Sequence, residues 1–341
     1  MSTRIAKARH TCHVFLFAFA AIVLMTLTGC ANRTVQINLV PTHAGIRPQM
    51  VHRSSHWFVC NRIAIVRISG MLADGRSGGL FGSGHNPVSD LRQTLDRIAH
   101  DPRVKAVILR LNTPGGTVTA SAMMYHDILA FKKKTHLPVI ASMMDLCASG
   151  GYYISCASDY QMAYPTTITA SIGVIVQLFN FHKSLGYLGI QAPVFVSGKN
   201  KDTASPFHRM SDSQRAIIQG FVNQFYARFL GIAKKTHPLV PAKDWSWLAD
   251  GRPMTGTDAA RYHLINGLGN LDDAIALAKK MAHIRHANVV LYARSSHGHG
   301  SIYAHSQPMH TGEEFNMFNV NLNPSAAAAM LHPTFLYMWE N

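Results

Sequence analysis

A serine followed by two glycines, at the end of an apolar run, constrains the fold of this chain more than any other feature. The apolar residues 138–144 precede the sequence CASGGYY (147–153), and small or apolar residues continue to Ala157. This order predicts a strand, a sharp turn at Ser149 and a helix, because glycine allows backbone conformations that other residues resist. The N–H groups at a helix start favour negative charge, which suits a reactive serine. Turns without any chemistry use the same residue types, so the turn alone leaves both interpretations open.

A second strand and glycine turn lies upstream of the first. Residues 107–111 are typical of a buried strand, and they run into Asn112-Thr113-Pro114-Gly115-Gly116 and then a predicted helix at 120–135. The N–H groups of these glycines would complete an oxyanion hole, which acyl transfer needs for its tetrahedral intermediate. Repeated units of this kind predict an α/β fold with a parallel sheet.

A reactive serine also needs a general base near neutral pH. The segment SGKNKDTASPF (197–207) supplies Lys199 and Lys201 in a loop before a long predicted helix. A lysine can serve as the base where burial lowers its pKa. Residues two apart on an extended segment share a face, so spacing does not decide between the two lysines. Ser171, in the sequence TASIGVI (169–175), lies between the turn and this loop.

Five stretches in this order resemble the signal peptide peptidase family, also called the protease IV family. They are LNTPGG (111–116), CASGGYY (147–153), ASIGVI (170–175), SGKNKDTASPF (197–207) and ADGRPMTGTDAARYHLINGLG (249–269). The similarity extends over residues 62–282, and the motifs follow the family's order and spacing. The resemblance implies a serine endopeptidase with a Clp protease/crotonase-like α/β fold, repeated strand–turn–helix units and a helical C-terminal part.

The resemblance also implies a role for each candidate residue. Ser149 corresponds to the nucleophile and Lys201, not Lys199, to the base. Ser171 would orient Lys201 by a hydrogen bond. The implied oxyanion hole consists of backbone N–H groups near Gly115, Gly116 and Gly150.

Further implications concern cofactors, partners and assembly. No metal or cofactor is required, and the substrates are apolar peptides such as remnant signal peptides. Short members of the family form ring-like or dome-like homo-oligomers in which a neighbouring subunit can contribute the lysine, so Lys201 would act in trans. The chain departs from the family at Thr113, where serine is usual, and at Ala170, where glycine is common. Neither change removes a functional atom.

The amino terminus predicts where the protein resides. A basic start precedes the nearly all-apolar run 14–27, and Leu27-Thr28-Gly29-Cys30 forms a lipobox. This run is shorter than the roughly 20 residues that span a membrane and fits a signal peptide. We expect cleavage after residue 29 and lipid on Cys30, with an uncleaved signal anchor as the alternative. Several acyl chains give stable anchoring. Ala31, in place of an aspartate, favours the outer membrane and a periplasm-facing protein.

Composition restricts the partners. The formal net charge is +15, from 32 Lys and Arg against 17 Asp and Glu, and the basic residues are dispersed. Without a nucleic-acid motif this argues against nucleic-acid binding, whereas a basic surface suits an anionic membrane. The 20 histidines include His297-Gly298-His299, but no carboxylate or cysteine set accompanies them, so we expect no metal site.

Three alternatives remain open at this point. Cys147 is a rival nucleophile without an evident histidine partner nearby. A crotonase-type acyl-CoA enzyme shares the fold and the oxyanion hole, although an export signal places the chain away from cytosolic CoA. A non-catalytic scaffold lipoprotein with a relic site is the third.

The pattern predicts four regions and several elements. The regions are a signal peptide (1–29), a leader from lipidated Cys30 (30–60), one peptidase domain (61–294) and a His-rich tail (295–341). No repeat of 20–50 residues suggests a tandem duplication. The expected elements include strands at 63–69 and 194–197 and helices at 89–100, 211–236, 257–263 and 272–283.

Overall fold

The structure is a computed structural model that describes residues 46–56, 58–75, 86–293, 301–302 and 335–338. The chain divides into two compact units, Met1–Ala44 and Gly45–Asn341, and every described residue belongs to the second. The predicted signal peptide, Cys30 and most of the predicted tail lie outside the described residues.

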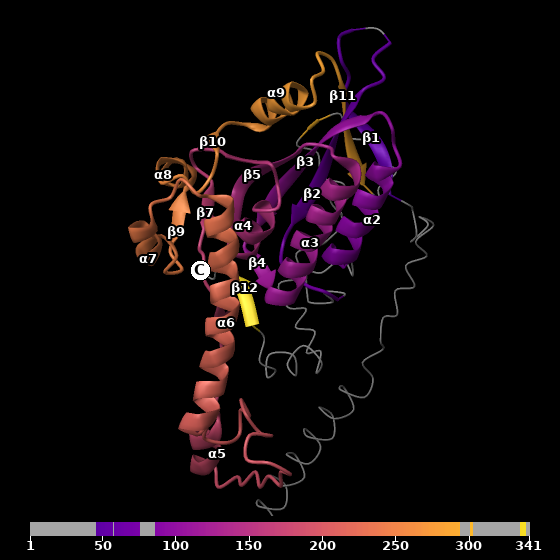
Figure 1. Ribbon diagram of the computed structural model, residues 1–341. Helices are drawn as coiled ribbons and strands as arrows, with labels where there is room; N and C mark the ends of the chain where they lie inside the picture. The colour runs from indigo at the N-terminus through magenta and orange to yellow at the C-terminus, as the bar shows by residue number, and fades with distance from the viewer. Residues whose placement is uncertain (1–45, 57, 76–85, 294–300, 303–334, 339–341) are drawn as a thin grey trace, which may run out of the picture. The chain divides into compact units, whose positions relative to one another are not determined.

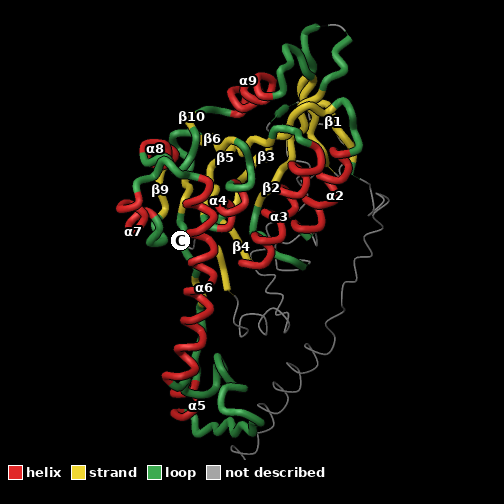
Figure 2. Tube along the Cα trace, in the orientation of Figure 1, coloured by secondary structure: helices red, strands yellow, loops and turns green. Residues whose placement is uncertain are grey.

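A nine-stranded sheet forms the centre of the described unit (Figures 1 and 2). Its strands are β1 Arg47–His52, β2 Arg62–Ser69, β3 Val104–Thr113, β5 Val139–Ala148, β6 Tyr160–Ala163, β7 Ile168–Ala170, β9 Pro253–Thr255, β10 Gly267–Leu268 and β11 Asn288–Ala293. The path β1-β11-β2-β3-β5-β6-β10 is parallel except at its β1 edge, and β7 pairs with both β5 and β9. The predicted α/β fold with a mostly parallel sheet is confirmed.

Alternate residues of the central strands face two separate hydrophobic clusters. In β2, Ala64 and Val66 point into one cluster together with residues of helices α2 (Pro87–Ala99) and α3 (Val118–Thr135). Ile63 and Ile65 point the other way, toward helix α9 (Leu271–Met281). Strands covered on both faces read as continuous apolar runs, which explains the sequences of β2, β3 and β5.

Three helix starts follow from capping side chains. The predicted helix at 89–100 begins earlier, at Pro87, because the Asn86 side chain accepts hydrogen bonds from the N–H groups of Val88 and Ser89. Pro87 needs no donor at the first helical position. Helix α3 is capped by Thr117. The predicted capping box of Ser211 and Gln214 is present at the start of the long helix.

Shorter elements complete the unit. The helices are α4 Gly150–Ser155, α5 His182–Tyr187, α6 Asp212–Thr236, α7 Trp245–Leu248 and α8 Gly256–Arg261, with a 3-10 turn at Ala242–Asp244. A second, small sheet has the order β4-β12-β8, formed by Gly115–Thr117, Phe335–Met338 and Ile175–Val176.

Helix α6 connects two environments. Phe229 and Ala233, near its C-terminal end, are buried against the main cluster. The N-terminal end lies beside α5 and the segment between β8 and α6 (Figure 1), where most side chains are exposed.

The strand expected at 194–197 is wrong, because residues 188–211 contain no strand. Val194, Phe195 and Val196 are exposed instead. Several strands lie where the sequence pattern predicts none. Among them are β1, within the range taken as the leader, and β12, within the range taken as the tail.

Candidate active site

Ser149 occupies a strained turn between a strand and a helix. It follows the last residue of β5 and precedes the first residue of α4, with φ 51° and ψ −111°. Its N–H donates to the carbonyl of Ala170 at 2.8 Å, which fixes the turn. A non-glycine residue at positive φ is uncommon, and such strain is found most often at functional sites. The predicted sharp turn at Ser149 is therefore confirmed.

The Ser149 hydroxyl is buried. The residue is 1% exposed, and its Oγ has no hydrogen-bond partner within the described part of the chain. Buried polar atoms are normally paired. An unpaired buried hydroxyl at a strained turn suits a group that reacts with a ligand.

The two glycine turns predicted from the sequence meet backbone to backbone. Gly115, at φ 107°, lies so close that a Cβ on it would stand 2.7 Å from the N atom of Gly150. A Cβ on Gly150 would stand 2.6 Å from the hydroxyl oxygen of Ser121. Both positions therefore require glycine, and their backbones lie beside Ser149.

Ser171 is brought to Ser149 by strand register. Strands β5 and β7 are parallel, and their last residues, Ala148 and Ala170, lie opposite each other. Ser149 directly follows the first strand, and Ser171 directly follows the second. Ser171 has φ 52°. Its hydroxyl donates to the carbonyl of Gly251 at 3.0 Å, and its N–H donates to the carbonyl of Arg252 at 3.0 Å.

Neither candidate lysine is brought to Ser149 within the chain. Lys199 and Lys201 are exposed. Their loop is held at the start of α6 by the side-chain amide of Gln214. This amide donates to the Lys199 carbonyl at 3.2 Å and to the Asp202 carboxylate at 2.8 Å. Phe229, which contacts Tyr153 of α4, lies about 15 residues further along α6, or roughly 22 Å. The loop thus lies at the far end of α6 from α4 (Figure 1).

Cys147 is unsuited to act as a nucleophile. It is fully buried, and burial raises the pKa of its thiol, with a smaller contribution from nearby Cys156. The reactive form of cysteine is the thiolate. The structure therefore disfavours the thiol alternative.

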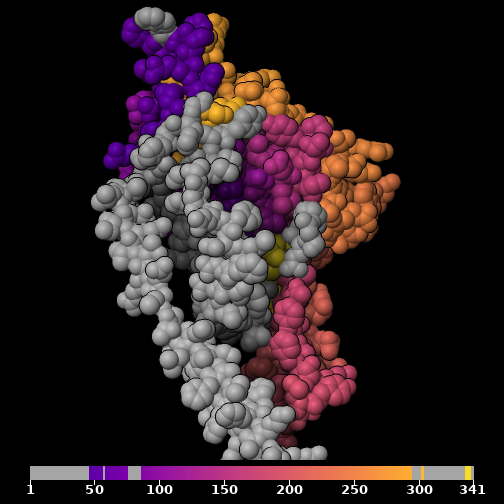
Figure 3. All heavy atoms as spheres, turned by 180° about the vertical axis from the view of Figure 1, so that it is seen from behind, coloured from indigo at the N-terminus to yellow at the C-terminus, as the bar shows by residue number. Residues whose placement is uncertain are grey.

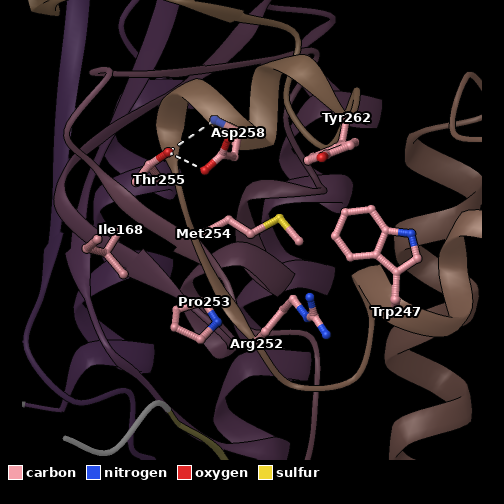
Figure 4. A pocket seen from close by; sticks show the side chains of 8 residues that line it. All are labelled: Ile168, Trp247, Arg252, Pro253, Met254, Thr255, Asp258 and Tyr262. Carbon is pink, nitrogen blue, oxygen red and sulfur yellow. Dashed lines mark hydrogen bonds between the residues drawn. The ribbon is translucent and has the colours of Figure 1, made fainter.

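A cavity of about 410 Å³ is lined by residues of β7, β9, α7 and α8 (Figure 4). The Arg252 guanidinium stands 5.2 Å from the centre of the Trp247 ring, and Trp247 meets Tyr262 edge to face at 4.7 Å. Sequence reasoning did not single out this cavity. None of the candidate catalytic side chains lines this cavity. One of its lining residues, Arg252, accepts a hydrogen bond from the Ser171 N–H through its backbone carbonyl.

The described residues contain neither a metal-binding cluster nor a membrane-spanning helix. Within the described ranges, no group of three or more His, Cys, Asp or Glu side chains is arranged to hold a metal ion. No helix of the described part is both long and apolar enough to cross a membrane.

Comparison with known proteins gives a consistent set of relatives. Residues 131–285 match the model of "Peptidase family S49". A protein of Enterococcus faecium named "Putative signal peptide peptidase SppA" is 33% identical over 240 residues, which cover 70% of this chain and 69% of that protein. "Protease 4" of Haemophilus influenzae is 34% identical over 71% of this chain, but that alignment spans only 38% of the larger protein. "Serine protease SPPA, chloroplastic" of Arabidopsis thaliana is 30% identical over 66% of this chain and 33% of its own length.

Proposed function

Because this chain belongs to peptidase family S49 and is a serine peptidase of that family, we propose that it cleaves apolar peptides, such as remnant signal peptides, with Ser149 as the nucleophile. The observation that carries this proposal is the strained turn at Ser149, beside the joined glycine turns, where the hydroxyl has no hydrogen-bond partner among the described residues. Family membership confirms the resemblance found in the sequence, including the Clp protease/crotonase-like fold.

The chemistry follows from the backbone around Ser149. The serine Oγ attacks the peptide carbonyl, and negative charge develops on the carbonyl oxygen. The N–H groups of Gly150 and Gly116 would stabilise this charge, because preorganised donors act where charge develops. The Gly115 N–H donates to the Thr113 hydroxyl at 3.1 Å, so it is not among these donors. Water then releases the acyl group from Ser149. The close approach of Gly115 to Gly150 supports this assignment.

The general base in this proposal is Lys201 of a neighbouring copy of the chain, oriented by Ser171. The position of the lysine loop at the far end of α6 supports an intermolecular base. The same segment exposes a set of large apolar side chains, namely Phe179, Phe181, Tyr187, Leu188, Ile190, Val194 and Phe195. An exposed apolar surface of this size is an aggregation hazard unless a partner covers it. A homo-oligomer would cover it and deliver the lysine.

The location is part of the same proposal. The lipobox ending at Cys30 supports cleavage after residue 29 and a lipid anchor. The protein would then sit at the bacterial envelope facing the periplasm, with the outer membrane favoured by Ala31.

The test compares Ser149→Ala with Cys147→Ala, using the purified full chain in detergent and fluorogenic apolar peptides. We expect Ser149→Ala to lose several orders of magnitude in kcat/KM while its circular dichroism and thermal unfolding match those of the parental protein. Cys147→Ala should keep most of the activity. Near-parental turnover by Ser149→Ala would refute the nucleophile assignment. Absence of turnover in the parental protein would favour a relic site on a scaffold lipoprotein.

A further inference from the structure

The loop before β9 holds Ser171 in place. The Ser171 hydroxyl donates to the carbonyl of Gly251 at 3.0 Å, and the Ser171 N–H donates to the carbonyl of Arg252 at 3.0 Å. Both acceptors lie within two residues of the start of β9, which pairs with the strand that ends at Ser171. Since a φ of 52° lies outside the strand region, these two bonds hold Ser171 in a conformation that the strand itself does not fix.

The Ser171 hydroxyl is left as a hydrogen-bond acceptor. A serine hydroxyl carries one proton and two lone pairs. A carbonyl can only accept, so the proton of Ser171 lies toward Gly251. Any further partner of the Ser171 oxygen must therefore donate. A lysine amine that donates one N–H to this oxygen keeps its lone pair for the proton of Ser149. The Gly251 carbonyl thus sets the direction in which a lysine base would be held.

An ion pair closes the loop on itself. The Arg252 guanidinium donates to both oxygens of the Asp250 carboxylate, at 2.9 Å from Nε to Oδ1 and at 2.6 Å from Nη2 to Oδ2. The Arg252 backbone N–H donates to the same Oδ1 at 3.1 Å. Such two-point pairing fixes geometry as well as adding attraction. The hydrogen bonds from Arg252 lower the pKa of Asp250, so the carboxylate stays ionised near neutral pH.

The backbone between the two charged residues packs against the segment that carries Ser171. Gly251 has φ 96°, a conformation that favours glycine. A Cβ on Gly173, two residues after Ser171, would stand 3.2 Å from the Cα of Gly251. A shift of the loop would therefore also displace the residues around Ser171.

Two aromatic side chains hold the loop from outside. The Tyr226 hydroxyl of α6 donates to the carbonyl of Ala249 at 2.8 Å. The Arg252 guanidinium lies 5.2 Å from the centre of the Trp247 ring, and Figure 4 shows the two side chains side by side. The loop is thus tied to α6 and to α7 as well as to β7.

The ion pair itself is open to solvent. The side chains of Arg252 and Asp250 are 49% and 40% exposed. The elements α7, β9 and α8 around the loop form one edge of the described unit (orange in Figures 1 and 3). Exposed ion pairs contribute little to folding stability. Removal of this pair should therefore leave the fold intact while it frees the loop.

We propose that Asp250 and Arg252 are positioning residues for the peptidase reaction: their ion pair fixes the two carbonyls that hold Ser171, which in turn accepts a hydrogen bond from the lysine base. The proposal rests on the proposed function, in which Ser149 is the nucleophile. Both charged residues act through Ser171. Loss of the pair frees the loop, lets the Ser171 hydroxyl turn, and leaves the lysine poorly oriented toward Ser149.

The first arm of the test measures peptide cleavage by Arg252→Ala, Arg252→Lys and Asp250→Asn in the full chain purified in detergent. We expect each to lose about 10- to 100-fold in kcat with little change in KM, because a misplaced base costs rate and not binding. Arg252→Lys keeps the charge but not the two-point pairing, so its loss separates geometry from charge. The matched control Arg92→Ala removes a similarly exposed arginine of α2 that pairs with Asp127, and it should keep parental activity.

The second arm combines Arg252→Ala with Ser171→Ala. If Arg252 acts through Ser171, the double variant should lose little more than Ser171→Ala alone, since residues that act as a unit give non-additive losses. The pH profile of kcat is a further readout. Loss of the acceptor disfavours the charged lysine, so the acid limb should move to lower pH by roughly half a unit in Ser171→Ala and in Arg252→Lys, and should not move in Arg92→Ala.

The outcomes separate this inference from the proposed function. Thermal unfolding checks the fold of each variant, and Arg252→Lys replaces Arg252→Ala in the double variant if the latter unfolds. If the parental protein cleaves peptides and folded Arg252→Lys and Asp250→Asn keep its kcat, the inference fails while the function of Ser149 stands. Losses that multiply fully in the double variant would make Arg252 a structural residue and also overturn the inference. If the parental protein cleaves no peptide, both fail.

Discussion

A dyad divided between two copies of the chain predicts that two inactive variants restore each other's activity. Ser149→Ala removes the nucleophile but keeps the lysine loop, and Lys201→Ala removes the proposed base but keeps the serine. Within one chain the loop is held by Gln214 at the start of α6, roughly 22 Å along the helix from the residue that contacts α4. A lysine side chain does not span that distance. Each variant alone should therefore be inactive, and mixed assemblies should not be.

The size of the rescue follows from random mixing. In a closed ring each site takes its serine from one subunit and its lysine from the next. In an equal mixture, half of the subunits supply an intact serine and half of their neighbours supply an intact lysine, so about a quarter of the sites are complete. A dyad within one chain would give no complete site in the same mixture.

The assay mixes the two variants under conditions that exchange subunits, verified by energy transfer between labelled chains, and measures peptide cleavage per site. A second mixture sharpens the result. In an equal mixture of the double variant Ser149→Ala/Lys201→Ala with parental protein, about a quarter of all sites should be complete if the dyad is shared and about half if it is not. Verified exchange with background activity in the first mixture would place the dyad within one chain. If Lys199→Ala is inactive while Lys201→Ala is active, the other lysine is the base.

Two further predictions concern the anchor and the core. Mass spectrometry of the membrane fraction should find a diacylglyceryl-modified peptide that begins at Cys30, and Cys30→Ser should accumulate as uncleaved precursor; an unmodified Cys30 in intact precursor would favour a signal anchor. His237 is 3% exposed, and burial lowers its pKa from 6.5 to about 4. Because the pKa of His237 is lower in the folded state than in the unfolded state, neutral His237 contributes fully to the free energy of unfolding above about pH 6.5. This contribution declines toward pH 4, by up to about 3 kcal/mol. Urea unfolding at several pH values should show this loss of stability. The variant His237→Gln should reduce the loss, and the exposed control His182→Gln should not. Equal pH dependence in both variants would contradict the argument.

The turn at Ser149 was predictable because its signals are local. An apolar run, a serine and two glycines follow one another, and each acts on the backbone of its own neighbourhood. The meeting of Gly115 with Gly150 was also predictable, since parallel strands bring their carboxyl ends to the same edge of a sheet. The helix start at Pro87 was misplaced because Asn86 and Ser89 are both good capping residues. Proline at the first helical position was the signal that decides between them.

The remaining errors share a different cause. Val194, Phe195 and Val196 have the composition of a strand, but a strand needs a partner, and composition does not say whether one is present. Their exposure in a single copy agrees with a role in contacts between copies. β12 was missed for the converse reason. Four residues in a weakly patterned tail give little local signal, and their conformation is set by the edges of β4 and β8, more than 150 residues earlier in the chain.

An intermolecular base imposes an order of events on the enzyme. A single copy holds the nucleophile and the glycine turns, but its lysine loop lies at the far end of α6. Peptide cleavage with a base from another copy therefore needs assembly first. Activity per chain should then fall on dilution over the concentration range in which the copies separate, and the exposed side chains of Val194, Phe195 and Val196 should lose their cover over the same range. Sedimentation and peptide cleavage measured on one dilution series test this order, and constant activity per chain while the copies separate would refute it.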